Sequence, residues 1–237
     1  MKRARTYTST FAAILLSACG GGNSATPTMP STSYDLQAGI KEMVTNGLSS
    51  NVGLSGTVTV NGASTPFTGS GTFTRPAATA ATFNGTAASS QTTTIAGTVS
   101  AAGQTTPYST SVTDFYAVSD GGFLGEASPT EYDVAQAPIL FPASVLGGSS
   151  GTLGTLSRYT DSTMSISLGT AQVSYSVMAP VDPGSPIGVA VTTKIYDTQN
   201  TIIETEVTNY TMTSSGVITL SGASAQNQSG MLTITPN

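Results

Sequence analysis

Few residues of this chain could carry out chemistry. Its 237 residues include no histidine and one cysteine. Without histidine there is no Ser-His-Asp triad, and the commonest zinc ligand is missing. Residues 147–151, Gly-Gly-Ser-Ser-Gly, match the hydrolase pattern G-x-S-x-G, but neither a histidine partner nor a following helix accompanies them. We therefore interpret this segment as a glycine-rich loop and predict that the protein is not an enzyme.

Carboxylates are the remaining candidates for a chemical site. Five of them fall within 20 residues without a basic neighbour: Asp114, Asp120, Glu126, Glu131 and Asp133. Carboxylate oxygens can bind calcium, but this spacing fits no known calcium loop. Paired carboxylates can also hydrolyse glycosidic bonds, yet the chain has no tryptophan on which a sugar would stack. We interpret these acids as solvated surface, predict no metal and no cofactor, and keep a carboxylate-dependent hydrolase as the least favoured alternative.

An apolar stretch between two prolines is a candidate contact surface. It reads Pro138-Ile139-Leu140-Phe141-Pro142. Because proline cannot donate to the ladder of a central strand, we predict a loop here. The favoured interpretation is a loop folded over the core. The alternative is a lip in which Ile139, Leu140 and Phe141 contact an apolar ligand, lipid or a partner protein.

Aromatic side chains are a second candidate lining for a cavity, although packing on the faces of a sheet is the favoured interpretation. They are Tyr108, Phe115, Tyr116, Tyr132, Tyr159, Tyr175, Tyr196 and Tyr210.

The single cysteine follows an N-terminal segment with three zones. The segment begins with Lys2, Arg3 and Arg5, continues with an apolar run over residues 11–16, and ends with small residues. The apolar run is far shorter than the roughly 20 residues that span a bilayer. Leu16-Ser17-Ala18-Cys19 resembles the lipobox of the bacterial lipoprotein signal peptide; beyond it, the chain resembles only uncharacterised β-rich envelope lipoproteins.

This resemblance implies that residues 1–18 are a signal peptide, cleaved between Ala18 and Cys19. It also implies a lipid on the Cys19 thiol and usually an acylated amino group, so that two or more chains anchor the protein firmly to a bilayer. Gly20 stands where the family's inner-membrane retention signal places aspartate. The implied location is the outer membrane of a Gram-negative bacterium, with the side it faces left open. Residues 19–32 then form the lipidated, flexible tether.

Charge excludes one class of partner. Beyond the leader the chain keeps four basic residues against twelve carboxylates, a net charge of −8. This balance argues against nucleic acid, whose binding depends on neutralising phosphates. Charged residues make up 8% of the chain, against about 25% in a typical soluble domain.

Hydrophobic patterning predicts one helix followed by strands. Leu36, Ile40, Met43 and Val44 recur at helical spacing. We predict a helix over about 33–47, capped by Ser33 and ended by Gly47. Two similar segments, 54–70 and 95–111, predict two copies of one hairpin. Alternating segments joined by short connections continue to the end of the chain, which favours antiparallel pairing.

About a dozen strands are too many for a flat open sheet, which must curl or close. We therefore predict a single mainly β domain over 33–237: a barrel or strongly curved antiparallel sheet, with the helix at one end. A two-sheet sandwich is the alternative. The predicted function is that of a membrane-anchored, non-enzymatic lipoprotein whose β domain binds a partner or an apolar ligand. A structural or surface-exposed spacer is the alternative.

Overall fold

The structure is a computed structural model that describes residues 32–60, 62–182 and 184–237. In these residues one helix precedes thirteen strands. The elements are α1 (Leu36–Asn46), β1 (Leu48–Val60), β2 (Ala63–Arg75), β3 (Thr79–Phe83), β4 (Thr86–Ala101), β5 (Gln104–Ala117), β6 (Phe123–Ser128), β7 (Glu131–Ile139), β8 (Ser150–Tyr159), β9 (Ser167–Met178), β10 (Ile187–Tyr196), β11 (Ile202–Met212), β12 (Ile218–Asn227) and β13 (Gly230–Pro236).

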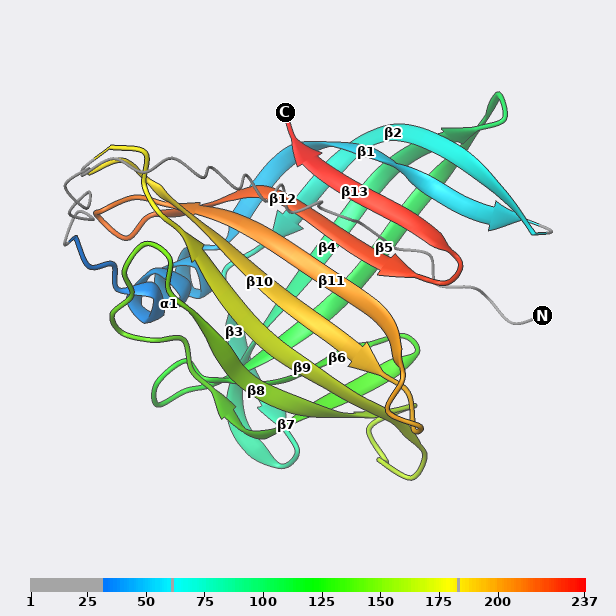
Figure 1. The fold of residues 1–237 in the computed structure, drawn as a ribbon. Helices are drawn as coiled ribbons and strands as arrows, with labels where there is room; N and C mark the ends of the chain where they lie inside the picture. The colour runs from blue at the N-terminus through cyan, green and yellow to red at the C-terminus, as the bar shows by residue number, and fades with distance from the viewer. Residues whose placement is uncertain (1–31, 61, 183) are drawn as a thin grey trace, which may run out of the picture.

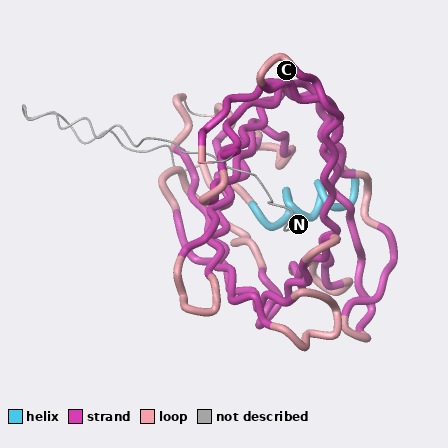
Figure 2. Tube along the Cα trace, turned by 90° about the vertical axis from the view of Figure 1, so that its right-hand side faces the viewer, coloured by secondary structure: helices cyan, strands magenta, loops and turns pink. Residues whose placement is uncertain are grey.

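Twelve of the strands form a closed antiparallel barrel. Each strand pairs with the next along the chain, except around β3, and the ring is completed by the pairs β1–β13 and β2–β4. The strands surround the interior when the molecule is seen from the end opposite the helix (Figure 2). The extra strand, β3, takes the place of β2 beside β4 after β2 has ended at Arg75. The predicted barrel is confirmed.

The two predicted hairpin copies are also present. They form the hairpins β1–β2 and β4–β5. They lie side by side because β2 pairs with β4 from Phe67↔Ala101 to Thr74↔Thr94.

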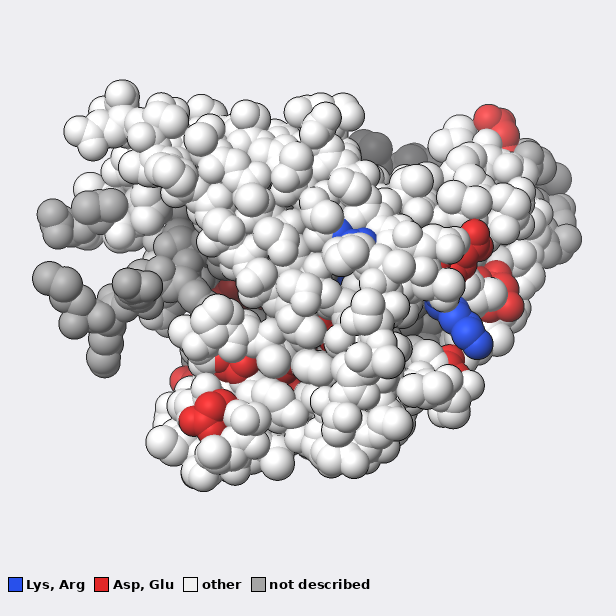
Figure 3. Space-filling model, turned by 180° about the vertical axis from the view of Figure 1, so that it is seen from behind, with Lys and Arg blue, Asp and Glu red and all other residues white. Residues whose placement is uncertain are grey.

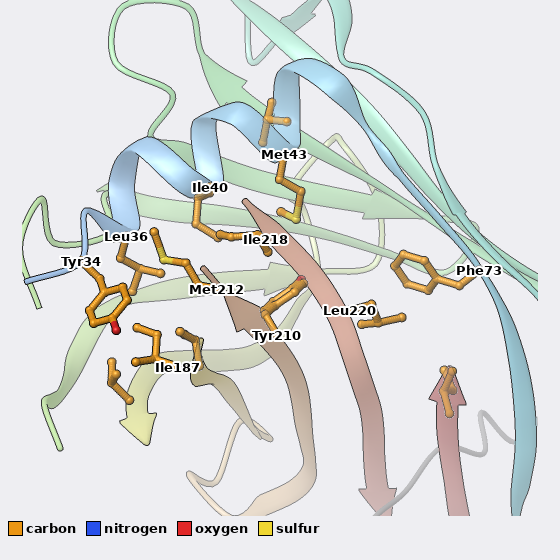
Figure 4. Close-up of a cluster of buried hydrophobic side chains, with 14 of the residues drawn as sticks. Tyr34, Leu36, Ile40, Met43, Phe73, Ile187, Tyr210, Met212, Ile218 and Leu220 are labelled. Atoms are coloured by element: carbon orange, nitrogen blue, oxygen red, sulfur yellow. The ribbon is translucent and has the colours of Figure 1, made fainter. Parts of the chain in front are cut away.

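Helix α1 lies across one end of the barrel (Figure 1). Its buried side chains, among them Leu36 and Ile40, belong to a hydrophobic cluster that includes Ile187, Met212 and Ile218 from the barrel wall (Figure 4). This burial holds the helix in place as a plug. No helix in the described parts of the chain has the length and apolarity needed to cross a membrane.

The ends of α1 differ in how well they were predicted. The N-cap is Asp35, whose carboxylate accepts a hydrogen bond from the Ala38 N–H at 2.9 Å. The predicted cap, Ser33, instead hydrogen-bonds to Ser144, so the helix begins three residues later than predicted. Gly47 ends the helix as predicted, since its φ of 78° is readily adopted only by glycine.

The segment after β7 differs from the predicted loop. Pro138 and Ile139 are the last residues of β7. Proline is tolerated there because β7 pairs with β8 only from Tyr132 to Ala135, so the missing N–H of Pro138 interrupts no bond to β8. The loop that follows secures α1: the Gln37 N–H donates to the Pro142 carbonyl at 3.1 Å.

The same loop also pairs through its backbone with the residues that precede α1. Tyr34 and Val145 exchange backbone hydrogen bonds of 3.0 and 2.9 Å. The helix is thus attached at its start to the barrel's own connecting loop.

Candidate functional site: a charged lumen

An unbroken row of polar side chains crosses five strands of the wall. Gln91, Asp114, Glu126, Asp133 and Arg158 are directly opposite one another from β4 to β8. Residues directly opposite in a ladder point to the same face, with Cβ atoms about 5 Å apart. All but Glu126 are buried, and Glu126 is half-buried. The row therefore faces the interior of the barrel.

Half of the chain's carboxylates lie in this lumen. Its six carboxylates are Asp114, Glu126, Glu131, Asp133, Glu204 and Glu206, and its two guanidiniums are those of Arg75 and Arg158. The exterior has few charges, as Figure 3 shows for one face of the molecule. The prediction of solvated acids is correct for Asp120, which is exposed, and wrong for the other four acids between residues 114 and 133.

Arg75 is the centre of one hydrogen-bonded network. Its Nε donates to Gln91 Oε1 and its Nη2 to Asp114 Oδ2, each at 2.5 Å. Nη2 also donates to the hydroxyl of Tyr116. Gln91 Nε2 donates to the carbonyls of Val44 at 3.2 Å and Pro76 at 2.8 Å. Since Val44 lies in the last turn of α1, the plug and the row of polar residues form one unit.

Burial and charge pairing oppose each other in this network. Burial disfavours the charged form of Arg75, but the nearby Tyr116 and Asp114 outweigh it, and the pKa of Arg75 lies above its usual value. The pKa of Asp114 is also raised, because the cost of burial exceeds the attraction of Arg75. Burial likewise raises the pKa of the Tyr116 hydroxyl.

Glu126 occupies the least favourable position in the row. Carboxylates stand directly opposite on both sides, Asp114 on β5 and Asp133 on β7. Burial, and then repulsion from the neighbouring acids, Asp114 first, raises the pKa of Glu126 well above its usual range. Glu126 therefore retains a proton at pH values at which an exposed glutamate is ionised.

Arg158 is the last residue of the row, and its guanidinium is only partly engaged in ion pairs and hydrogen bonds. Nη2 pairs with Glu131 Oε1 at 2.9 Å, and Nε lies 3.6 Å from Asp133 Oδ2. The side chain is 4% exposed, and Nη1 is buried with no hydrogen-bond acceptor in the described part of the chain. Because an unsatisfied buried donor is costly, this atom marks a place where an acceptor is missing.

Two adjoining cavities occupy the lumen. The inner chamber, about 240 Å³, lies under α1 and is lined by Ile40 and Met43, by Arg75 and Asp114, and by many apolar side chains. The outer chamber, about 220 Å³, is lined by Glu131, Arg158 and Glu204. Seven residues line both chambers and form the waist of the lumen: Phe73, Thr93, Val112, Glu126, Ile195, Glu206 and Thr208.

The three apolar residues predicted to form a lip do not share one surface. Ile139, 3% exposed, and Phe141 line the inner chamber. Leu140, 41% exposed, points to solvent. Any role of Ile139 and Phe141 in binding would therefore be exerted from inside the barrel.

Four of the aromatic residues divide between the two faces of the wall. Tyr116 and Tyr210 line the inner chamber. Phe115 and Tyr132 stack on Phe83 of β3, with ring centroids 4.5 and 5.2 Å apart. Gly125 makes room for this stack, because a Cβ there would lie 2.8 Å from the Phe83 ring.

Within the described residues, no three histidine, cysteine or acidic side chains are placed to hold a metal ion. The lipidation and cleavage residues, Ala18 and Cys19, lie outside the described residues. No family model, curated protein or solved structure matches this chain. Its fold and lumen define a closed antiparallel barrel, plugged by a helix and lined with acids, and its function has to be inferred from its own residues.

Proposed function

We propose that this protein is a non-enzymatic lipoprotein of the Gram-negative envelope, anchored through Cys19, whose barrel binds a small ligand in its lumen. The supporting observation is the pair of adjoining chambers lined by six carboxylates and two guanidiniums. Four of these groups, Arg75, Asp114, Asp133 and Arg158, are buried. Burying a charge costs several kcal/mol, and apolar residues would fill a purely structural core at lower cost. This favours a binding protein over a spacer.

The lumen refines the kind of ligand expected from the sequence. Apolar side chains line much of the inner chamber, but Glu126 and Glu206 stand at the waist. A wholly apolar ligand would remove water from these acids without offering them a polar contact, which is costly. The ligand that fits has a polar group as well as an apolar part.

A hydrolase is the second candidate, because Glu126 and Asp133 are directly opposite and the pKa of Glu126 is raised. Such a pair can supply a general acid and a base or nucleophile. The composition argues against it, because the chain has no tryptophan on which a sugar would stack. Hydrolysis of aryl glycosides by the wild-type protein, abolished in Glu126→Gln, would reverse this preference.

Anchoring is tested by mass spectrometry of the N-terminus of the full chain expressed in a Gram-negative host. We expect a mature protein that begins at an acylated Cys19. Cys19→Ser should leave the membrane fraction. A membrane-bound wild-type chain that keeps residues 1–18 and carries no lipid would refute the anchor.

Ligand binding is tested by extracting small molecules from the detergent-solubilised full chain and identifying them by mass spectrometry. We expect a stoichiometric compound from the wild type. Thr208→Trp, which fills the waist, should remove it. Thr205→Trp adds the same side chain three positions away on β11, where alternation places it on the outer face, and should keep the compound. Equal recovery from both variants would contradict binding in the lumen.

A further inference from the structure

We infer that the end of the barrel closed by α1 lies against a lipid bilayer, which it contacts through a rim of exposed apolar side chains. This plug rim consists of Val118, Leu140, Leu146, Met178, Val181 and Val217. The inference rests on the proposed function, because the bilayer is the one that a lipid on Cys19 would enter. It goes further in naming the surface of the folded domain that meets this bilayer.

The plug rim belongs to four connections that surround α1 at one end of the barrel: β5–β6, β7–β8, β9–β10 and β11–β12 (Figure 1). The bond from α1 to the β7–β8 connection is described above. In the β9–β10 connection, the Ser185 carbonyl accepts a hydrogen bond of 3.0 Å from the Tyr34 hydroxyl. In the β11–β12 connection, the Gly216 carbonyl lies so close to α1 that a Cβ at Gly39 would be 2.9 Å from it. The rim is therefore held around the helix.

The side chains of the plug rim are strongly exposed and lie close together. Val181 is 94% exposed and Leu146 is 50% exposed. Their connections touch, since a Cβ at Gly147 would lie 2.7 Å from the Cα atom of Ala179. Single exposed apolar residues are common on soluble proteins, but several gathered at one end of a domain mark a contact surface.

The place where the chain enters the domain identifies the bilayer as the partner. Tyr34 is paired through its backbone with Val145, which directly precedes Leu146 of the rim. The predicted tether before the domain, residues 19–31, lies outside the described residues. Its thirteen residues reach at most about 45 Å, and the thirteen residues of β1 extend over about 43 Å. The opposite end of the barrel could meet the bilayer only if the tether ran along the wall over most of its full reach.

The opposite end also has exposed apolar side chains, and these provide matched controls. Because consecutive strands are antiparallel, the β8–β9 and β10–β11 connections lie away from α1. Met164 and Ile166 are exposed in the first, and Ile202 is exposed beside the second. An anchor at Cys19 raises the effective concentration of lipid at the plug rim, so weak apolar contacts suffice to hold that end at the bilayer.

Charge favours an apolar contact over an electrostatic one. Anionic lipid surfaces attract clusters of lysine and arginine. The four connections of the plug rim contain neither residue, and they contain the exposed acids Asp120 and Asp182. Docking should therefore depend on insertion of apolar side chains at the boundary between headgroups and acyl chains, and a zwitterionic bilayer should be sufficient.

Introduced tryptophans test this orientation, because the chain has none of its own. Leu146→Trp and Val181→Trp place the reporter in the plug rim, and Ile166→Trp places it at the opposite end as the matched control. Each full chain is made by cell-free synthesis and coupled through Cys19, its single cysteine, to a maleimide lipid in phosphatidylcholine vesicles. Bromine atoms on the acyl chains of a second set of vesicles quench an indole that lies among the lipid tails.

We expect Leu146→Trp and Val181→Trp each to lose about half of their emission in the brominated vesicles, and Ile166→Trp to keep its emission. Circular dichroism checks that each variant is folded, and the two rim reporters are independent of each other. Equal quenching at the two ends of the barrel, or none at the rim, would overturn the inference. A blue-shifted rim tryptophan that brominated lipid does not quench would show that a second copy of the chain covers the rim, which would overturn it too.

A second substitution tests whether the apolar side chains hold the barrel at the bilayer. Val181→Asp, added to Leu146→Trp, should restore most of the emission that brominated lipid removes. Ile202→Asp, added to the same reporter, changes an exposed apolar residue at the opposite end and should restore none. Equal quenching in the two double variants would contradict a contact made by the plug rim. So would a requirement for phosphatidylglycerol in the vesicles.

Chemical coupling at Cys19 separates this inference from the proposed anchor. If the chain from a Gram-negative host carries no acyl group but the coupled chain shows quenching at the rim, the anchor is wrong and the rim remains a lipid-binding surface. If Cys19 is acylated and the rim tryptophans are not quenched, the anchor stands and this inference falls.

Discussion

Replacing Glu126 by glutamine should stabilise the barrel, and the gain should grow with pH. Glutamine has the shape of a protonated glutamate but cannot ionise. In the wild type, folding raises the pKa of Glu126, chiefly through burial and then through Asp114 and Asp133. The native state therefore keeps a proton that the unfolded chain releases near pH 4.3. Stability is greatest below that pH and is lost as pH rises through the native pKa.

The size of this stability difference follows from how far the native pKa of Glu126 lies above its unfolded pKa. Each unit by which the native pKa exceeds the unfolded pKa corresponds to about 1.4 kcal/mol. The two directly opposite carboxylates alone account for about 0.4–2 kcal/mol, at 0.2–1 kcal/mol for each like-charged pair, and burial adds to this. We expect Glu126→Gln to match the wild type at pH 4.5 and to exceed it by at least about 1.4 kcal/mol at pH 8.

Urea unfolding of the detergent-solubilised full chain measures the free energy of unfolding at pH 4.5 and at pH 8. Unfolding is followed by circular dichroism because the chain has no tryptophan. Glu42→Gln is the control, and its difference from the wild type should not change with pH. A difference between Glu126→Gln and the wild type that is the same at pH 4.5 and 8, or a variant less stable than the wild type at pH 8, would refute the account of Glu126 as a desolvated acid repelled by its neighbours.

Three further substitutions test the network, the plug and the apolar segment by the same unfolding assay. Arg75→Met should cost about 3–5 kcal/mol, because it leaves the buried Asp114 without its counter-charge; a loss below about 1 kcal/mol would contradict the ion pair. Leu36→Ala removes a side chain that is 0% exposed and should cost about 2–5 kcal/mol; an unchanged midpoint would mean that α1 is not packed as a plug. Ile139→Ala should cost about 2–5 kcal/mol and Leu140→Ala about 0.5 kcal/mol or less, since only Ile139 is buried; equal losses would indicate a lip rather than a chamber wall.

The barrel could be predicted because hairpin turns and period-two alternation are local signals. The glycine-containing turn at residues 102–103, with positive φ at both residues, is an example. Closure followed from the number of strands. The start of α1 and the end of β7 were misplaced. Asp35 and Ser33 are both good N-caps, so the sequence does not distinguish them. Pro138 is tolerated in β7 because β7 no longer pairs with β8 at that position, which the sequence does not show.

The charged lumen could not be predicted in the same way. Alternation shows which residues share a face, but not which face is enclosed. In β5, Val112, Asp114 and Tyr116 share the inner face, while Phe115 lies on the outer face with the stack around Phe83. Because apolar side chains stand on both faces of this strand, alternation did not single out the enclosed face, and Asp114, Glu126 and Asp133 were not recognised as a row. Their alignment depends on the register between strands, which only the paired structure shows.

The pairing of β1 with β13 has a consequence for how the chain reaches its final shape. Residues 52–58 meet residues 230–236, so contacts between distant parts of the sequence must form before the wall is complete. Such long-range pairing makes folding slow. An unfinished polypeptide would have its first strand unpaired on one side and prone to self-association, so the chain would need protection from aggregation until its last strand is available for pairing.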